Sequence, residues 1–310
     1  MKIAIIGATS FLGKTLIAEL KKVKHNLHLF SRVNSFDWIP SASWTCYNYP
    51  SNPLDYKELI AFDVIYYCAG AGIQPKHEDN NAQIYELNTF EPIRLATALK
   101  DNSYTGKFIT FGSYFEIGNH QEERSYTEKD LATHSNPLPN AYCTAKNLLT
   151  RFVDTELRNP KGLPFVFQHF ILTNIYGATE NDQRLIPYII KSSIQKEPLS
   201  FTAGTQERQY THIRDVTGFL ANNLSVNESG VFNLTANAVI SVREMIGKVL
   251  QVVEEELGIK PQATFGTADK RDVSMKYLAL NTSRLQNCFN FEPQISLEQG
   301  IKEYIIRWVP

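Results

Sequence analysis

A tyrosine and a lysine stand four positions apart in the stretch NAYCTAKNLL, as Tyr142 and Lys146. Residues four apart lie on the same face of a helix, so the ammonium group can stand close to the phenol. A free phenol has a pKa of about 10 and is a poor proton shuttle at neutral pH, but a nearby positive charge favours the phenolate and lowers that pKa. The pair could therefore act as a general acid and base, or be two ordinary helix residues, and the spacing alone does not decide.

A second chemical signal is the loop GATSFLG, which lies between an expected strand and an expected helix. Glycines there allow a tight turn, so that backbone amides at the helix N-terminus can approach a pyrophosphate. Ser10 stands where many such loops carry a middle glycine, and its hydroxyl can itself bind a phosphate. A turn without a ligand is the alternative, but the strand before and the helix after favour a dinucleotide site formed by Gly7, Thr9, Ser10, Phe11, Leu12 and Gly13.

The end of the second expected strand bears on the choice of cofactor. That strand ends at Ser31 and Arg32, and no acid follows before Asp37. An NAD site usually has an acid at this point to hold the ribose 2′-hydroxyl, whereas an arginine suits a 2′-phosphate. We therefore expect Ser31 and Arg32 at the adenosine ribose, with NADP(H) favoured and NAD(H) possible.

The elements that must position these residues follow from the hydrophobic pattern. Near-continuous apolar runs, typical of buried parallel strands, cover residues 2–7, 27–32, 63–70, 107–113 and 165–177. Apolar residues recur at helical spacing in residues 14–23, 83–100, 141–157 and 243–258. Strands that alternate with helices predict an α/β fold, a Rossmann-type doubly wound parallel sheet.

After residue 177 the apolar segments become shorter, and strand-like and helix-like patterns are mixed. We expect residues 1–177 to form the dinucleotide-binding domain. Residues 178–310 should mainly form a smaller, mixed α/β substrate domain, with the segment around 213–238 returning to the first domain.

The composition indicates which partners and which cellular compartment to expect. The 31 basic residues nearly balance the 32 acidic ones and no long basic run occurs, so a nucleic-acid partner is not expected. No apolar segment approaches the roughly 20 residues that span a bilayer, so we expect no membrane partner. The four cysteines are scattered without metal-type spacing, which predicts a soluble cytoplasmic protein with no metal site.

Eight segments, in order, resemble the extended short-chain dehydrogenase/reductases, the nucleotide-sugar epimerase/dehydratase family. They are GATSFLG, DVIYYCAG, FGSYFEIG, NAYCTAK, LTNIYG, RLIPYII, RQYTHIRDV and SLEQGIKEYIIRW. The resemblance implies that Tyr142 exchanges a proton with the substrate, that Lys146 also holds the nicotinamide ribose, and that Ser113 hydrogen-bonds to the reacting oxygen. It also implies that Cys68, Ala69 and Gly70 line the cofactor and that Asn88 supports the active site.

The same resemblance suggests which residues contact the substrate. Asn174, Arg208 and Arg271 are the candidates for contact with the diphosphate of a nucleotide sugar, because an arginine fork matches phosphate oxygens and an asparagine can donate to one. We also expect the protein to be a homodimer.

The reaction type depends on the residues after Ser113. Dehydratases of this family carry an Asp-Glu pair there, but this chain has Tyr114 and Phe115, so a sugar dehydratase is not expected. Because Arg32 favours NADPH, we expect a reductase of a nucleotide-linked 4-keto-6-deoxy sugar, on the way to a surface-polysaccharide precursor. An epimerase with tightly bound NAD is the main alternative. A non-catalytic dinucleotide sensor is a third possibility, which the presence of all three catalytic residue types disfavours.

Overall fold

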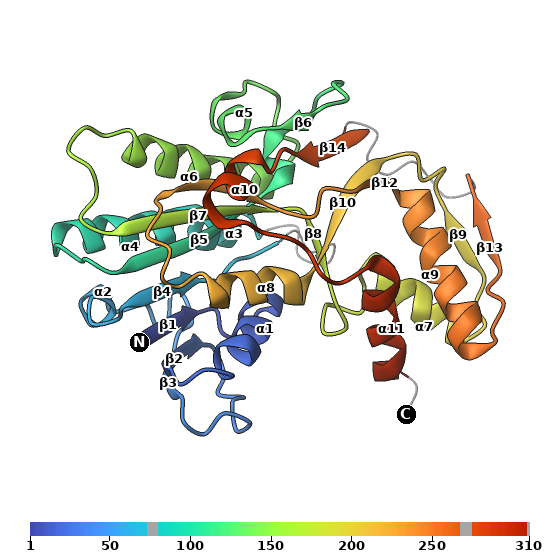
Figure 1. The fold of residues 1–310 in the computed structure, drawn as a ribbon, viewed down its shortest axis with the longest axis horizontal. Helices are drawn as coiled ribbons and strands as arrows, with labels where there is room; N and C mark the ends of the chain where they lie inside the picture. Colours follow the sequence, from blue (N-terminus) through green and yellow to red (C-terminus); the bar gives the residue numbers. More distant parts are fainter. Residues whose placement is uncertain (73–79, 267–274, 309–310) are drawn as a thin grey trace.

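A parallel β-sheet forms the centre of the larger lobe of the computed structural model, which describes residues 1–72, 80–266 and 275–308 (Figure 1). Every strand pairing within the described part of this sheet is parallel, and β1 is flanked by β2 and β4. From one edge to the other, the strands are β11 (Gly230–Leu234), β7 (Val166–Leu172), β5 (Lys107–Ser113), β4 (Val64–Tyr67), β1 (Lys2–Ile6), β2 (Asn26–Ser31) and β3 (Ser43–Cys46).

Both faces of this sheet are buried. In β1, Ile3 and Ile5 pack into one apolar cluster, while Ala4 and Ile6 point to the opposite face and pack into another. This double burial explains why the strands are near-continuously apolar in the sequence.

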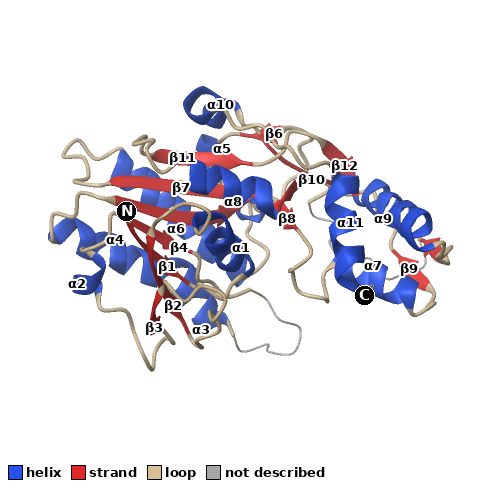
Figure 2. Ribbon diagram, turned by 60° about the horizontal axis from the view of Figure 1, so that its bottom comes forward, coloured by secondary structure: helices blue, strands red, loops and turns tan. Residues whose placement is uncertain are grey.

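Helices cover each face of the sheet (Figure 2). The first face packs against α1 (Phe11–Leu20), α8 (Ile213–Asn222) and α10 (Ser283–Phe289). The second face packs against α2 (Tyr56–Leu59), α4 (Glu91–Asp101) and α6 (Ala141–Leu157). The predicted Rossmann-type, doubly wound sheet is therefore confirmed.

The expected strand at residues 165–177 is divided between two sheets. β7 stays in the parallel sheet, whereas β8 (Asn174–Tyr176) leaves it and pairs with β10 (Glu207–His212). The buried Thr173 lies between them, and its hydroxyl hydrogen-bonds to that of Thr235 at 2.7 Å. Because other polar residues, such as Gln168 and His169, stand inside β7 itself, Thr173 gave no distinct signal for this change of sheet.

The smaller lobe is a mixed α/β region, as expected. In its larger sheet, β10 pairs with β12 (Val239–Ser241), β14 (Tyr277–Leu280) and β8, and β14 pairs in turn with β6 (Ser125–Tyr126). In a separate pair, β9 (Leu199–Phe201) lies beside β13 (Ala263–Phe265). Three helices pack together around a third apolar cluster: α7 (Leu185–Ile194), α9 (Val242–Leu257) and α11 (Leu297–Trp308). The boundary at residue 177 stays a prediction. The chain contributes β6 to the mixed sheet before that residue and β11 to the parallel sheet after it.

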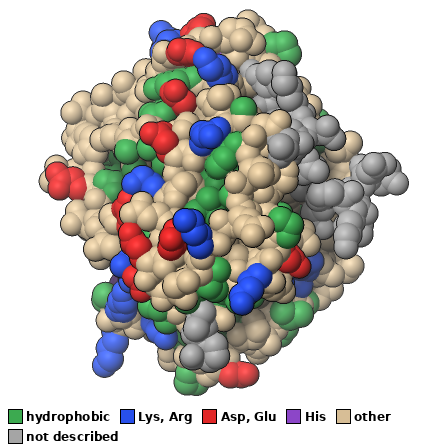
Figure 3. Space-filling view, turned by 90° about the vertical axis from the view of Figure 1, so that its right-hand side faces the viewer, with side chains coloured by type: hydrophobic (Ala, Val, Ile, Leu, Met, Phe, Trp, Pro, Cys, Tyr) green, Lys and Arg blue, Asp and Glu red, His purple; other side chains and the backbone are tan. Residues whose placement is uncertain are grey.

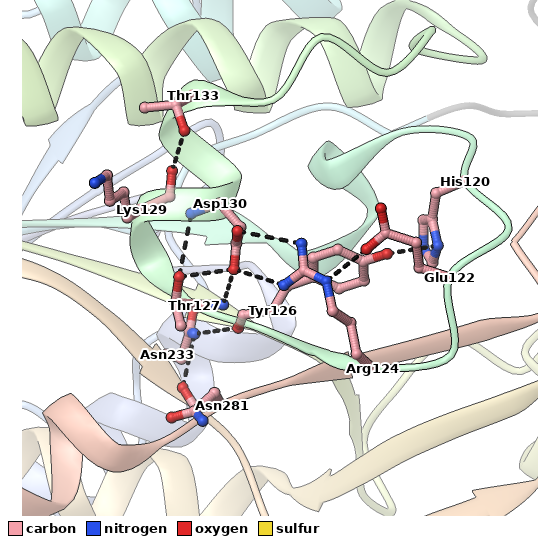
Figure 4. Close-up of polar contacts among 10 residues, drawn as sticks. All are labelled: His120, Glu122, Arg124, Tyr126, Thr127, Lys129, Asp130, Thr133, Asn233 and Asn281. Atoms are coloured by element: carbon pink, nitrogen blue, oxygen red, sulfur yellow. Dashed lines mark hydrogen bonds and ion pairs between the residues drawn. The ribbon is translucent and has the colours of Figure 1, made fainter.

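Polar contacts fix the segment that connects β5 to α6 (Figure 4). The Arg124 guanidinium donates to both carboxylate oxygens of Asp130, at 3.0 and 3.2 Å, and holds the pKa of Asp130 down at about 2. The Thr127 backbone N–H donates to the Asp130 carboxylate at 2.8 Å, and the Asp130 N–H donates to the Thr127 hydroxyl at 3.2 Å. This reciprocal cap begins α5 (Glu128–Thr133).

Asn233 of β11 ties the same segment to the mixed sheet. Its Nδ2 donates to the backbone carbonyls of Tyr126, at 3.0 Å, and Asn281, at 2.8 Å (Figure 4). The Tyr126 carbonyl also accepts from the Asn281 N–H at 2.9 Å, so the buried amide adds a second link between these two backbone segments. The connection between β5 and α6 is thereby held against β11 and β14.

The surface of the smaller lobe carries charges of both signs, interspersed rather than gathered into one patch (Figure 3). Among the described residues, no helix is long and apolar enough to cross a membrane. Within the same residues, no group of three or more His, Cys, Asp or Glu side chains could hold a metal ion.

Candidate active site

A cavity of about 670 Å³ opens where the parallel strands end. Its walls come from the N-terminus of α1, the turn after β4, the last residues of β5, the first turns of α6 and the start of β8. Open α/β sheets bind ligands at this edge, and the volume is typical of a small-molecule site. Of the residues predicted from the sequence, the cavity brings together Ser10, Phe11, Leu12, Cys68, Ala69, Gly70, Ser113, Tyr142, Lys146 and Asn174.

The loop after β1 depends on its glycines for a close approach. Gly7 has a φ of +82°, and a Cβ at this position would lie 2.4 Å from the Ala69 backbone nitrogen. A Cβ on Gly13 would lie 2.5 Å from the Gly7 carbonyl oxygen. A side chain at either position would push the loop away from β4 or α1 away from β1.

Three of the residues between these glycines, Ser10, Phe11 and Leu12, line the cavity. Ser10 is the N-cap of α1 and accepts a hydrogen bond from the Gly13 N–H at 3.0 Å, while its own hydroxyl hydrogen can still be donated to a ligand. Among the described residues of this loop, Gly7, Thr9 and Gly13 do not line the cavity; Ser10, Phe11 and Leu12 do. The helix N-terminus and the serine therefore provide donors for an anionic group.

The end of β2 lies outside this cavity. Ser31 is buried; its hydroxyl donates to the Val33 carbonyl at 2.7 Å and accepts from Trp44 Nε1 at 3.0 Å. Arg32 is exposed at the end of the strand. Neither residue is among the described lining residues of the cavity, so their contact with a cofactor stays a prediction.

A π-helical turn brings Asn88 to the cavity. The helix predicted at residues 83–100 is α3 (Asn81–Tyr85), then the π-helix η1 (Glu86–Phe90), then α4. Pro92 has no N–H to donate to the carbonyl of Asn88, which favours this local change of winding. Asn88 Nδ2 donates to the carbonyls of Ala71 at 2.7 Å and Ile84 at 2.9 Å, and so supports the turn after β4.

Helix α6 places Tyr142 and Lys146 in the cavity wall. Its N-cap is Asn140, whose Oδ1 accepts from the Cys143 N–H at 3.0 Å, so Tyr142 lies in the first turn and Lys146 one turn later. The Lys146 ammonium is 5.9 Å from the centre of the Tyr142 ring and donates to the Phe111 carbonyl at 2.8 Å. Ser113, at the end of β5, forms a side-chain hydrogen bond with Tyr142.

The pKa of Tyr142 differs from the expectation drawn from the sequence. Burial raises the pKa of Tyr142, and the Ser113 hydrogen bond and the Arg184 charge lower it without overcoming burial. Burial also lowers the pKa of Lys146 to about 8. The prediction that Lys146 shifts the phenol below its ordinary pKa was therefore wrong for the protein alone, because burial is the largest influence on both groups.

A second cavity, of about 660 Å³, continues from the first into the smaller lobe. The two cavities share Asn174, Ile175 and Arg184 in their walls. The predicted substrate residue Arg208 lines the second cavity. It is 5% exposed, and its Nη1 donates to the carbonyls of Glu207 at 2.8 Å and Lys276 at 3.2 Å. Arg271, the third candidate, lies outside the described residues.

One cation at the junction of the cavities was not singled out from the sequence. Arg184 lies just before α7 and pairs with the buried Glu180 at 3.0 Å. Burial raises the pKa of Glu180 to about 7, although Arg184 acts against that shift. In the sequence, Arg184 stands directly before an apolar helix, and an arginine at that place is common without any binding role.

Comparison with known proteins gives the family. The model of the NAD dependent epimerase/dehydratase family matches residues 3–234, so this chain belongs to that family. It is an NAD(P)-dependent enzyme of the short-chain dehydrogenase/reductase type, as the order of motifs predicted.

Individual similarities are distant but extensive. CDP-abequose synthase from Salmonella muenchen is 23% identical over 314 residues, which cover 98% of this chain and 97% of that protein. GDP-6-deoxy-D-mannose reductase from Pseudomonas aeruginosa is 23% identical over 256 residues, 79% of this chain and 80% of that protein. The crystal structure of UDP-glucuronic acid 4-epimerase from Bacillus cereus in complex with NAD superimposes with a TM-score of 0.78 at 18% identity, covering 100% of both chains. This last likeness shows the fold.

Proposed function

We propose that this protein is an NAD(P)H-dependent reductase of a nucleotide-linked 4-keto-6-deoxy sugar, acting in deoxysugar or surface-polysaccharide precursor biosynthesis. The observation that carries the proposal is the pair of residues after Ser113. Tyr114 is buried, and Phe115 faces the cavity where a dehydratase would present its acid pair. A phenyl ring has no proton to exchange with a sugar carbon. The site is therefore equipped for transfer of hydride and one proton, but not for elimination of water.

The proton chemistry of the site suits reduction. Because burial raises the pKa of Tyr142, the phenol keeps its proton at neutral pH and can give it to a carbonyl oxygen. Ser113 is placed to donate to the same oxygen, and the Lys146 ammonium lies one helical turn from the phenol. A bound reduced nicotinamide supplies the hydride.

The first cavity fits a dinucleotide. Its volume, the glycine-dependent turn and the donors at the N-terminus of α1 match what a pyrophosphate needs. We propose that Ser10, Phe11 and Leu12 contact the cofactor on one side, and that Cys68, Ala69 and Gly70 contact it on the other. The exposed Arg32 supports NADP(H) as the preferred form, with NAD(H) possible.

The second cavity fits the nucleotide diphosphate of the substrate. Asn174 stands at its entrance from the first cavity, and Arg208 lies in its wall. A cation and an amide along one channel can bind a diphosphate while the sugar extends toward Tyr142. The similarity to a CDP-abequose synthase and to a GDP-6-deoxy-D-mannose reductase supports this class of substrate.

An epimerase that recycles tightly bound NAD is the second candidate. The observation that favours it is the structural likeness to a UDP-glucuronic acid 4-epimerase in complex with NAD. A non-catalytic sensor is disfavoured, because Ser113, Tyr142 and Lys146 line one cavity together.

We also propose a homodimer. Phe90 and Leu148 are 44% and 42% exposed on η1 and α6, neighbouring elements that are joined by a hydrogen bond from the Thr89 hydroxyl to the Ala145 carbonyl at 2.7 Å. A second copy of this face would cover both side chains. Light scattering should give twice the chain mass, and Leu148→Glu should lower it.

The proposed activity is tested with NADPH and a panel of nucleotide-linked 4-keto-6-deoxy sugars. Loss of NADPH absorbance that depends on one of these sugars supports a reductase. Interconversion of nucleotide hexoses without added cofactor would support the epimerase instead.

A further inference from the structure

A buried carboxyl group lies directly behind the wall of the first cavity. Glu116, on the short turn η2 (Tyr114–Ile117) that follows Ser113, is fully buried. Its Oε1 accepts from the Thr150 hydroxyl at 2.8 Å, and its Oε2 accepts from the Ser113 N–H at 3.4 Å. Burial raises the pKa of Glu116 to about 7, against these hydrogen bonds and Lys146. A neutral glutamine has one accepting oxygen and an NH2 group that only donates, so it could keep only one of these two bonds, whereas the carboxylate accepts both.

A chain of hydrogen bonds ends on this carboxyl group. Since the Thr150 hydroxyl donates to Glu116, its oxygen is left to accept from His169 Nε2 at 2.9 Å. His169 Nδ1 then accepts from the Thr110 hydroxyl at 2.7 Å. Burial and Lys146 lower the pKa of His169 to about 3, so the ring is neutral in this arrangement. The Thr150 hydroxyl, the last donor of this chain, donates to Glu116 and favours its carboxylate form.

The carboxyl group and the Lys146 ammonium approach the same short piece of strand. Lys146 Nζ donates to the Phe111 carbonyl at 2.8 Å. At the next residue, Gly112, a Cβ would lie 3.2 Å from Glu116 Oε1 and 2.8 Å from His169 Nε2. The glycine therefore leaves the space in which the carboxyl group and the imidazole come together behind the strand.

Several titratable groups interact with Glu116 from the elements packed against η2. Lys146 and Tyr142 on α6 interact with its charge, and the ring of His134 at the end of α5 hydrogen-bonds to the Glu116 backbone. His169 on β7 reaches the carboxyl group through the Thr150 hydroxyl, which hydrogen-bonds to both. The negative carboxylate raises the pKa of Lys146, against the larger lowering by burial. It also raises the pKa of Tyr142, in the same direction as burial. The Glu116 carboxylate therefore favours the protonated form of both Lys146 and Tyr142.

We propose that Glu116 is a positioning residue whose buried carboxylate keeps the Lys146 ammonium and the Tyr142 phenol protonated at the pH at which the enzyme works. The role of the Glu116 charge in catalysis rests on the proposed function. Its effect on the protonation of Lys146 does not. In this role Glu116 touches neither substrate nor cofactor; it acts through Lys146 and Tyr142, which do.

The coupling is tested on the protein without substrate. Acetic anhydride reacts with neutral amines, so the pH dependence of Lys146 acetylation, read by mass spectrometry with the exposed Lys161 as internal reference, reports the protonation of Lys146. In Glu116→Gln the midpoint should move to lower pH by about one unit, because a neighbouring negative charge is lost. An unchanged midpoint in a folded variant would overturn the proposal.

Thr150→Val provides a second variant if the glutamine protein does not fold. It keeps Glu116 but removes the hydroxyl that stabilises the carboxylate, so the midpoint should move in the same direction by less. Thr150→Ser keeps the hydroxyl and is the matched control, with the wild-type midpoint expected. Equal midpoints in the valine and serine proteins would contradict the role of the carboxylate.

Activity supplies an independent readout. The alkaline limb of kcat/KM against pH should move to lower pH in Glu116→Gln, with activity retained on the acid side of that limb. If no 4-keto sugar is reduced, the acetylation midpoints still decide the role of Glu116. If the wild type reduces such a sugar but the midpoints coincide, the reductase stands and the proposal for Glu116 falls.

Discussion

At the scale of single residues, the candidate acid is defined by a balance between burial and hydrogen bonding. Burial raises the pKa of Tyr142, and the hydrogen bond from Ser113 opposes it. A phenol in this environment holds its proton until an oxygen with developing negative charge is placed beside it. That is the state a reductase needs before hydride transfer.

Tyr142→Phe removes this proton and leaves the ring. Turnover should fall by at least ~10²-fold, the usual scale of general acid catalysis, while cofactor affinity stays near that of the wild type. Steady-state kinetics and a cofactor titration measure the two effects separately. Retention of most of the activity would remove Tyr142 from the mechanism.

Arg32→Asp should shift the cofactor preference from NADPH toward NADH. The variant loses a partner for the 2′-phosphate and gains an acceptor for the 2′-hydroxyl. Dissociation constants for both cofactors, in the wild type and the variant, test this directly. The interpretation of Arg32 fails if the wild type already binds NADH more tightly.

Arg208→Ala should weaken nucleotide-sugar binding much more than cofactor binding. A hydrogen bond to a charged group contributes about 1.5–3 kcal/mol, or roughly ten- to a hundredfold in affinity. Because the arginine is buried and bonds to two backbone carbonyls, thermal unfolding of the variant serves as the control. An unchanged constant for the matching nucleoside diphosphate would place Arg208 outside the site.

At the scale of elements, the parallel strands and the main helices were predictable because their signals are local. The helix expected at 141–157 has these bounds in the structure, since Asn140 caps it and its apolar residues recur at helical spacing. The loop between Gly7 and Gly13 was predictable for the same reason, as strand, glycine and helix follow one another directly.

The elements that were missed depend on contacts that are distant in sequence. β8 leaves the parallel sheet because β10, more than thirty positions later, offers it a partner. The π-helical turn at Asn88 is stabilised by the Ala71 carbonyl, and Glu116 acquires its environment only when β7 and α6 pack beside η2. Likewise, whether burial or a neighbouring charge sets the pKa of Tyr142 cannot be determined from a spacing of four.

The packing of β5, β7 and α6 around His169 predicts a pH dependence of stability. The pKa of His169 is lowered from 6.5 to about 3, so between these values the unfolded chain binds a proton that the folded protein does not. The free energy of unfolding should therefore fall as the pH drops through this window, by on the order of 5 kcal/mol from this group. His169→Gln keeps a donor toward Thr150 but cannot be protonated, so its stability should fall less. Denaturant titrations of both proteins from neutral to acid pH measure the difference, and parallel curves would contradict the assignment.

At the scale of the whole molecule, the two lobes place two cavities end to end, with Asn174 and Arg184 in the wall they share. The first is built mainly from ends of the parallel strands, and the second from the mixed lobe. In the proposed function, a cofactor and a nucleotide sugar bind from opposite sides of this arrangement and meet at Tyr142. Epimerases, dehydratases and reductases all occur among the relatives of this chain. The proposed reductase is distinguished from an epimerase by whether the hydride stays in the product.

The most direct test follows that hydride. The enzyme is incubated with a nucleotide-linked 4-keto-6-deoxy sugar and NADPH that carries deuterium at the transferable position, and the product is analysed by mass spectrometry and NMR. We predict one deuterium at the new carbinol carbon for each NADPH oxidised, and no product without added cofactor. Isomerisation of a nucleotide hexose by NAD that remains bound to the protein, with no label entering the product, would contradict it.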